Sequence, residues 1–200
     1  MMEVTGIILA GGKNLRLGRN KALEKIGGVT VIERVVMSLK PIVNHLVIVT
    51  ADGKNHLITI SSAKFVADIY PGKGPLGGIY TGLSASRTEL NIAVACDMPF
   101  LNTELFKHML KLARGFDAVI PRTKESLFEP LHAVYSRTCL QVIKNHLESE
   151  QLSIRAFLAE VKVRYIEEAE CRQYDPELLS FFNMNRQSDY ERALKIAGNQ

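Results

Sequence analysis

Short apolar runs rich in β-branched residues recur along the first 120 residues of the chain. They cover Thr5–Leu9, His45–Thr50, Lys64–Ala67, Asn91–Ala95 and Ala118–Ile120. Between them lie segments with helical spacing of apolar residues, at Val31–Leu39, Gly78–Ser86 and Thr103–Arg114. Continuously apolar strands that alternate with helices indicate a parallel sheet covered on both faces. We therefore predict a three-layer α/β/α, Rossmann-like fold with a mostly parallel sheet.

The chain after Pro121 has a less regular pattern, but strands and helices are still predicted in it. Strands are predicted at Pro130–Tyr135 and Val161–Ile166, and helices at Cys139–Leu147 and Ser188–Ala197. Neither a repeat nor a low-complexity linker interrupts the pattern. Residues 1–200 are therefore expected to form one domain, a usual length for one hydrophobic core.

Composition narrows the class of protein. Hydrophobic residues make up 46% of the chain and charged residues 23%, as in ordinary globular proteins. Apolar runs stay shorter than the ~18 residues of a membrane span, and the N-terminus lacks a signal-peptide pattern. We expect a cytoplasmic protein that does not bind a membrane. The net charge of +4 comes without a basic run, so we expect anionic small substrates rather than nucleic acid.

The most informative polar pattern follows the first apolar run. Leu9-Ala10-Gly11-Gly12 is followed by Gly18 and then Lys21. Glycines let backbone N–H groups approach an anion, and a lysine adds a point charge, so this loop is predicted to bind nucleotide phosphates. The spacing fits neither the P-loop nor the G-x-G-x-x-G fingerprint. The alternative is a glycine-rich strand-to-helix turn without a ligand.

Two carboxylates follow later strands. Asp68 opens the segment Ile69–Gly78, whose glycines and prolines indicate a shaped loop, and it is equally suited to capping a turn. Asp97 comes directly after Asn91–Ala95 and before Pro99. In open α/β sheets ligands bind at the carboxyl ends of the strands, and Mg²⁺ prefers carboxylate and phosphate oxygens. Asp97 is therefore a candidate magnesium ligand, with a structural cap as the alternative.

These motifs together resemble the molybdenum cofactor guanylyltransferases, the MobA family. The resemblance rests on the loop from Leu9 to Lys21, on Gly74-Pro75-Leu76-Gly77-Gly78 and on Cys96-Asp97-Met98-Pro99-Phe100-Leu101. A weaker match, Phe182-Asn183-Met184-Asn185, resembles the family segment whose asparagines are implicated in holding molybdopterin. Asn183 and Asn185 could equally be strand-end or cap residues. The chain departs from the family pattern at Asn14 and Leu17.

The resemblance implies a nucleotide-diphospho-sugar transferase type of fold, with a GTP-binding N-terminal half and a pterin-side C-terminal half. It implies transfer of GMP from GTP to molybdopterin, with Lys21 and Asp97 catalytic and Mg²⁺ on Asp97. Nucleotide contacts are expected from Leu9, Ala10, Gly11, Gly12, Gly18, Lys21, Asp68 and Asp97, and molybdopterin contacts from Asn183 and Asn185. Transient contacts with cofactor-biosynthesis proteins and molybdoenzyme maturation partners are also expected. The alternatives are a cytidylyltransferase, a sugar-phosphate nucleotidyltransferase and a non-catalytic nucleotide-binding protein.

Overall fold

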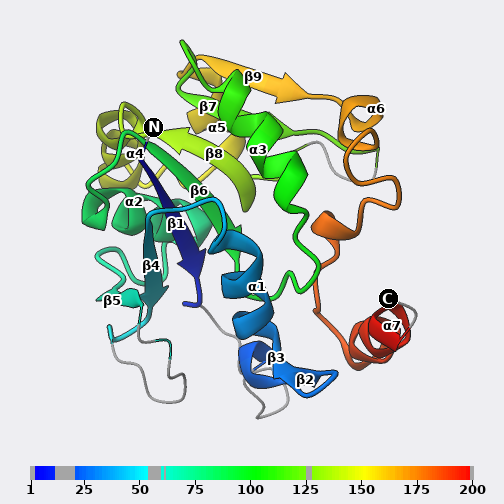
Figure 1. Cartoon of the computed structure of the whole chain (residues 1–200). Coiled ribbons are helices and arrows are strands. Elements are labelled where there is room, and N and C mark those ends of the chain that lie inside the picture. The colour runs from blue at the N-terminus through cyan, green and yellow to red at the C-terminus, as the bar shows by residue number, and fades with distance from the viewer. Residues whose placement is uncertain (1–2, 12–20, 54–59, 61, 125–127, 199–200) are drawn as a thin grey trace.

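The centre of the protein is a seven-stranded sheet (Figure 1). The computed structural model describes residues 3–11, 21–53, 60, 62–124 and 128–198. The strands of the sheet are β1 (Val4–Leu9), β4 (His45–Thr50), β5 (Ala63–Ala67), β6 (Leu90–Ala95), β7 (Ala118–Pro121), β8 (His132–Ser136) and β9 (Val163–Ile166). Their order across the sheet is β5-β4-β1-β6-β8-β7-β9. All seven runs predicted as strands therefore form the sheet.

Most neighbouring strands run parallel, as the continuous apolar pattern predicts. β1 lies between β4 and β6 and pairs in parallel with both, so that Ile7 faces Val47 on one side and Ala93 on the other. β8 is the exception, because it runs antiparallel to both β6 and β7. The carboxyl ends of β1, β4, β5 and β6 consequently meet at one edge of the sheet.

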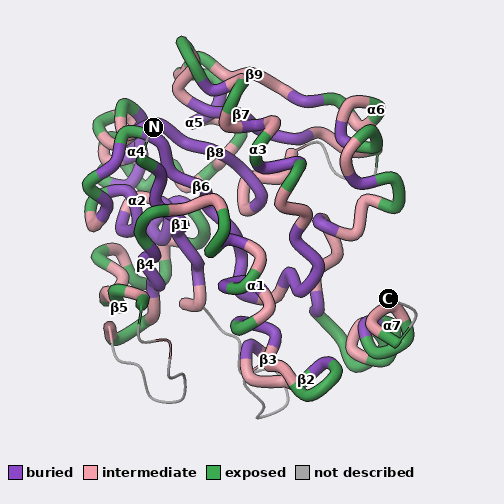
Figure 2. Tube along the Cα trace, in the orientation of Figure 1, coloured by how far each residue is buried: buried purple, intermediate pink, exposed green. Residues whose placement is uncertain are grey.

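Helices cover both faces of the sheet and complete three layers (Figure 1). They are α1 (Val31–Leu39), α2 (Gly74–Ala85), α3 (Thr103–Leu112), α4 (Cys139–Glu148), α5 (Ile154–Ala159), α6 (Glu168–Cys171) and α7 (Gln187–Gly198), with 3-10 turns η2 (Lys21–Leu23) and η3 (Leu179–Phe181). Ile8 points into the core shared with α1 and α3, whereas Ile7 and Leu9 point into the core shared with α2, α4 and α5. The buried strands form the purple centre of Figure 2. Within the described chain, every helix is too short or too polar to cross a bilayer.

Helix α2 begins at Gly74, four residues before the predicted start at Gly78. The segment predicted as a shaped loop up to Gly78 therefore ends in the first turns of a helix. Pro75 fits there because the first helical turn has no intrahelical partner for its missing N–H. Close packing favours glycine at positions 77 and 78. A Cβ added at Gly77 would lie 2.8 Å from the Tyr70 carbonyl oxygen, and one added at Gly78 would lie 3.1 Å from the Leu9 side chain.

The closest approach of α2 to the sheet is at Gly82. An added Cβ there would lie 2.3 Å from Cγ2 of Ile7, which is fully buried in β1. We expect Gly82→Ala to lower the free energy of unfolding by about 1–3 kcal/mol, because overpacking outweighs the helix propensity of alanine. Urea denaturation measures the change, and Ser84→Ala on the exposed side of α2 is the matched control. Equal or greater stability of Gly82→Ala would contradict this packing.

Several short elements are absent from the sequence-based prediction. The hairpin of β2 (Lys25–Ile26) and β3 (Val29–Thr30) turns through Gly27 and Gly28, which have positive φ angles of 60° and 85°. The Gly-Gly pair between apolar residues was the available signal for this hairpin. Helices α5 and α6 were also missed, because six and four residues are too few for a clear helical period.

Candidate functional site

A cavity of about 530 Å³ opens at the edge where the parallel strands end. Residues from β1, β4, β6, the start of α2 and the C-terminal segment contribute to its wall. They are Leu9, Gly11, Val49, Asp68, Gly72, Gly74, Pro75, Gly78, Ala95, Cys96, Asp97, Leu131, Asn183 and Asn185. Six of the residues predicted from the sequence as site residues therefore line one cavity: Leu9, Gly11, Asp68, Asp97, Asn183 and Asn185.

Asp97 is the partly buried carboxylate of this cavity. It follows Cys96, whose backbone N–H donates to the carbonyl of Leu9 at 3.2 Å and so continues the β1–β6 pairing. Burial raises the carboxyl pKa of Asp97, and a backbone hydrogen bond at Asp97 and the charge of Lys21 only partly offset this effect. Asp97 is therefore harder to ionise than an exposed aspartate.

Lys21 is not among the residues that line the cavity, but the C-terminal segment holds it beside the cavity wall. Its Nζ donates to the carbonyl oxygen of Asn185 at 2.7 Å, across 164 residues of sequence. One residue earlier, the backbone N–H of Met184 donates to the carbonyl oxygen of Asp97 at 3.0 Å. Residues 184 and 185 therefore contact both residues predicted as catalytic. The sequence carries no signal for this arrangement, because it depends on pairing between distant segments.

The two asparagines are held by local hydrogen bonds. Asn183 Nδ2 donates to the carbonyl of Phe181 at 3.1 Å. The backbone N–H groups of Asn185 and Arg186 both donate to Oδ2 of Asp189, at 2.8 and 2.7 Å, so Asp189 is the residue that caps this turn. Both asparagines line the cavity. Their role in holding molybdopterin stays a prediction.

Asp68 performs the turn-capping role that the sequence left open. Its Oδ1 accepts hydrogen bonds from the Tyr70 backbone N–H at 3.0 Å and from the Thr81 hydroxyl at 2.9 Å. Thr81 in turn accepts from the backbone N–H of Ile69. These bonds fix the turn before α2 while Asp68 still lines the cavity. Capping and nucleotide contact are therefore compatible, and the second stays a prediction.

The glycine loop is only partly within the described residues. Ala10 continues the sheet, because its backbone N–H donates to the carbonyl of Val49 at 2.8 Å. Gly11 lines the cavity, and a Cβ there would meet neighbouring protein atoms only at 3.7 Å, so its own packing does not demand glycine. Gly12 and Gly18 lie outside the described residues.

Other reactive side chains are poorly suited to chemistry. Cys139 and Cys171 are buried, and burial raises the pKa of each thiol to about 12. Among the described residues, no three His, Cys, Asp or Glu side chains are grouped to hold a metal ion. The expected role of Asp97 as a metal ligand stays a prediction.

Comparison with known proteins shows the family to which the chain belongs. The family described as "MobA-like NTP transferase domain" matches residues 6–166, which include Lys21, Asp68 and Asp97. The chain belongs to the MobA-like NTP transferase family. It is therefore a nucleotidyltransferase, and the resemblance stated from the sequence motifs is confirmed.

Relatives of this MobA-like transferase match along their whole length. "Molybdenum cofactor guanylyltransferase" of Desulfosudis oleivorans is 39% identical over 195 residues, covering 96% of this chain and 95% of the relative. "Probable molybdenum cofactor guanylyltransferase" of Pelotomaculum thermopropionicum is 35% identical, and the match covers 100% of this chain and 96% of the relative. The crystal structure of molybdopterin-guanine dinucleotide biosynthesis protein A from Archaeoglobus fulgidus matches with a TM-score of 0.83 and 29% identity. The match covers 98% of this chain and 100% of that structure's chain.

A more distant structure supports the fold alone. The 2-C-methyl-D-erythritol 4-phosphate cytidylyltransferase of Thermus thermophilus has a TM-score of 0.71 at 14% identity, and it covers 96% of this chain and 98% of its own. Together with the Archaeoglobus structure and the family match, it confirms the predicted fold type, that of the nucleotide-diphospho-sugar transferases.

Proposed function

We propose that this protein transfers GMP from GTP to the terminal phosphate of molybdopterin, giving the guanine dinucleotide cofactor and pyrophosphate. The observation that carries the proposal is that residues 184 and 185 contact both Lys21 and Asp97, while Asp97 and Asn185 line one cavity. Support also comes from relatives named guanylyltransferases, which match nearly the whole chain at 35–39% identity.

In the proposed reaction, a phosphate oxygen of molybdopterin attacks the α-phosphorus of GTP. A bond forms between that oxygen and the α-phosphorus, and the bond from the α-phosphorus to the bridging oxygen breaks. The bonding electrons leave with pyrophosphate. Because the attacking phosphate is already anionic at neutral pH, the protein does not need to remove a proton. Catalysis then depends on alignment and on stabilising negative charge.

Asp97 is the proposed ligand for Mg²⁺. Members of the family generally use a divalent metal. The residues present fit such an ion, because Asp97 is a partly buried carboxylate that lines the cavity. When bound, the ion would supply positive charge that stabilises the negative charge of the reacting phosphates. Asp97 itself supplies the fixed anionic ligand that places this charge at the end of β6.

Lys21 is proposed to hold the phosphates of GTP. Its ammonium contacts the carbonyl oxygen of Asn185 at the rim of the cavity, which leaves further donors for phosphate oxygens. We expect Lys21→Ala to lower kcat/KM for pyrophosphate release by about 10²-fold or more, the scale of losing one electrostatic donor. Lys25→Ala, an exposed lysine on β2, is the matched control. Near-normal turnover of Lys21→Ala would contradict the assignment.

Base selection distinguishes the proposed function from its alternatives. Asp68 and the Leu9–Gly11 backbone line the cavity and are proposed to contact the guanine nucleotide, with Gly12 and Gly18 completing the loop. We expect GTP with Mg²⁺ to raise the melting temperature more than CTP, ATP or UTP, because a ligand of the native state stabilises it. Pyrophosphate release with GTP and molybdopterin then tests catalysis. Selectivity for CTP would indicate a cytidylyltransferase, and binding without pyrophosphate would indicate a non-catalytic protein.

A further inference from the structure

A second cavity, of about 320 Å³, lies at the edge of the sheet opposite the substrate cavity. The starts of β1, β4 and β5 and the end of α2 surround it, and its polar wall includes Thr5, Asn44, His45, Ser62, Lys64 and Arg87. Lys64 and Arg87 are exposed cations, and the residues that line this cavity include no carboxylate. The cavity is therefore suited to a negatively charged group.

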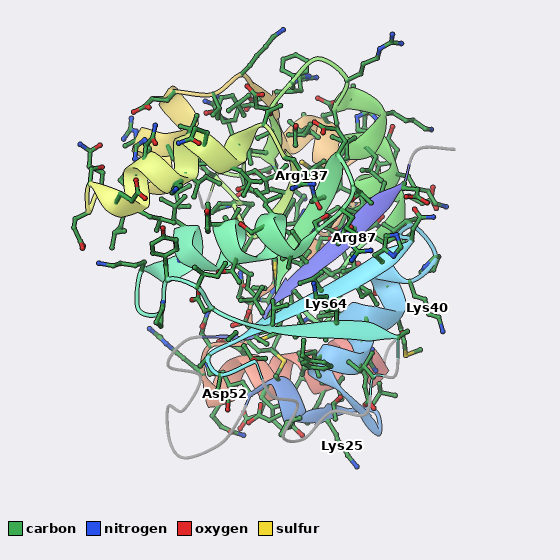
Figure 3. All side chains as sticks on the ribbon, turned by 90° about the vertical axis from the view of Figure 1, so that its left-hand side faces the viewer. Lys25, Lys40, Asp52, Lys64, Arg87 and Arg137 are labelled. Carbon is green, nitrogen blue, oxygen red and sulfur yellow. The ribbon has the colours of Figure 1, made fainter. Side chains whose placement is uncertain are left out.

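The positive charge continues beyond the cavity wall. Lys40 follows the C-terminus of α1, and Arg137 follows β8. Figure 3 labels Lys40, Lys64, Arg87 and Arg137 on the face turned to the viewer, with Asp52 at the far edge. We call these four cations the basic row. They come from four separate parts of the chain, so the basic row forms only when the chain is folded.

The four side chains of the basic row are unpaired. Throughout the residues that the structure describes, its four side chains form no salt bridge and no hydrogen bond. Some other cations are paired with carboxylates, as in Lys73–Glu150 and Arg164–Glu170, whereas exposed Lys25 and Lys111 form no ion pair within the described residues. Unneutralised charges gathered at one edge repel one another, and an anionic partner would relieve that repulsion.

The charges near the basic row leave it net positive. Glu3 precedes β1 and Glu89 precedes β6, so both lie at the same edge of the sheet. Glu89 already accepts a hydrogen bond from the Ser136 hydroxyl. Asp117 precedes β7 at this edge as well, and its carboxylate accepts from the Thr138 hydroxyl and the Lys162 backbone N–H. Four permanent cations thus face three carboxylates. One apolar side chain, Met37, is 62% exposed one helical turn before Lys40.

We propose that the basic row is a docking surface for an acidic segment of a partner protein. One carboxylate side chain of that segment enters the cavity between Lys64 and Arg87, and neighbouring carboxylates meet Lys40 and Arg137. A protein fits better than a single small anion because the row extends past the cavity at both ends. Exposed Met37 supports this partner, since methionine and arginine are enriched in protein interfaces.

Nucleic acid fits this surface less well. His45 is the only ring among the cavity's lining residues, whereas single-stranded nucleic acid is usually bound by stacking on aromatic rings. Docking at this edge leaves the substrate cavity at the opposite edge open. The partner can therefore remain bound while substrates enter and products leave, and this inference does not depend on which nucleotide the protein uses.

The test is binding of a fluorescein-labelled hexaglutamate peptide, measured by fluorescence anisotropy with saturating GTP to occupy the substrate cavity. We expect salt-sensitive binding to the wild type and a loss of affinity of about fivefold or more in Lys64→Glu and in Arg87→Glu, the scale of reversing one surface charge. Lys25→Glu, which reverses one charge on β2, should bind the peptide like the wild type. Pyrophosphate release should be unchanged in the Lys64 and Arg87 variants.

Other outcomes would overturn the proposal. Absence of peptide binding, or equal affinity in all variants, would show that the basic row does not bind acidic segments. Tighter binding of inorganic phosphate, a single-stranded oligonucleotide or phosphatidylglycerol vesicles in the same assay would assign the surface to that partner instead. If a charge reversal prevents folding, Lys64→Gln and Arg87→Gln replace it, with Lys25→Gln as the control.

Discussion

Asp97→Asn is expected to lower kcat/KM for pyrophosphate release by about 10²-fold or more while leaving the protein at least as stable as the wild type at pH 7. The loss of activity follows because the amide cannot supply the anionic ligand proposed for Mg²⁺. The maintained stability follows from burial, which raises the carboxyl pKa of Asp97 in the folded protein. An ionised Asp97 therefore costs stability at neutral pH, and asparagine removes that cost.

The pH dependence of stability tests whether an ionised Asp97 destabilises the folded protein. The folded protein holds the Asp97 proton more tightly than the unfolded chain, so the wild type loses stability as pH rises through the raised pKa. Asp97→Asn should lack this loss, and the difference in melting temperature should disappear in acid, where both side chains are neutral. Glu191→Gln on the exposed side of α7 is the charge-matched control.

Metal binding gives a separate readout for Asp97. With GTP present, Mg²⁺ should raise the melting temperature of the wild type and have a much smaller effect on Asp97→Asn. Near-normal turnover of Asp97→Asn, or an undiminished Mg²⁺ response, would contradict its role as the metal ligand.

The second large effect is expected at His132, in β8. Its ring is fully buried, and neither ring nitrogen has a hydrogen-bond partner among the described residues. It stacks on Phe106, with centroids 4.1 Å apart, and packs against the edge of Phe181 at 4.7 Å. Burial lowers the pKa of His132 from 6.5 to about 3, so the imidazole is neutral in the folded protein.

This depressed pKa makes the protein sensitive to acid. The unfolded chain takes up a proton on His132 below pH 6.5, whereas the folded protein does not until about pH 3. Stability is therefore complete above pH 6.5 and is lost as pH falls through that window. Between pH 7.5 and pH 5 the loss from this histidine is about 2 kcal/mol, from 1.36 kcal/mol for each pKa unit.

His132→Leu should remove that loss, because leucine keeps an apolar side chain of similar volume without a titrating group. Urea denaturation at pH 7.5 and pH 5 measures the difference, and His45→Gln removes an exposed histidine as the control. If the wild type and His132→Leu lose the same stability between these pH values, His132 is not the group that titrates.

The sequence predicted the sheet well because its strands are buried on both faces. Runs such as Thr5–Leu9 and Asn91–Ala95 are almost continuously apolar, which is typical of a central strand buried on both faces. They form β1 and β6. The start of α2 was misplaced because Gly74–Gly78 has the composition of a loop. Its glycines serve close contacts with Tyr70 and Leu9, which are tertiary and cannot be read from local sequence.

A similar limit applies to the site. Asp97 could be found because it follows an apolar strand, and Lys21 because it follows glycines. The backbone of residues 184 and 185 could not be assigned its role, because a carbonyl or N–H group carries no sequence signature. For Asp68, the sequence left a choice between capping a turn and contacting a ligand. The structure shows that the two roles are compatible, because Asp68 caps the turn and also lines the cavity.

The bridge from residues 184 and 185 to Lys21 and Asp97 has a consequence for synthesis of the protein. A ribosome makes the chain from the N-terminus at about 5–20 residues per second, and folding can begin before synthesis ends. A nascent chain that has passed β9 already contains every strand of the sheet. It still lacks the segment that joins Lys21 to Asp97, so we expect a growing chain to acquire its central architecture before its catalytic competence.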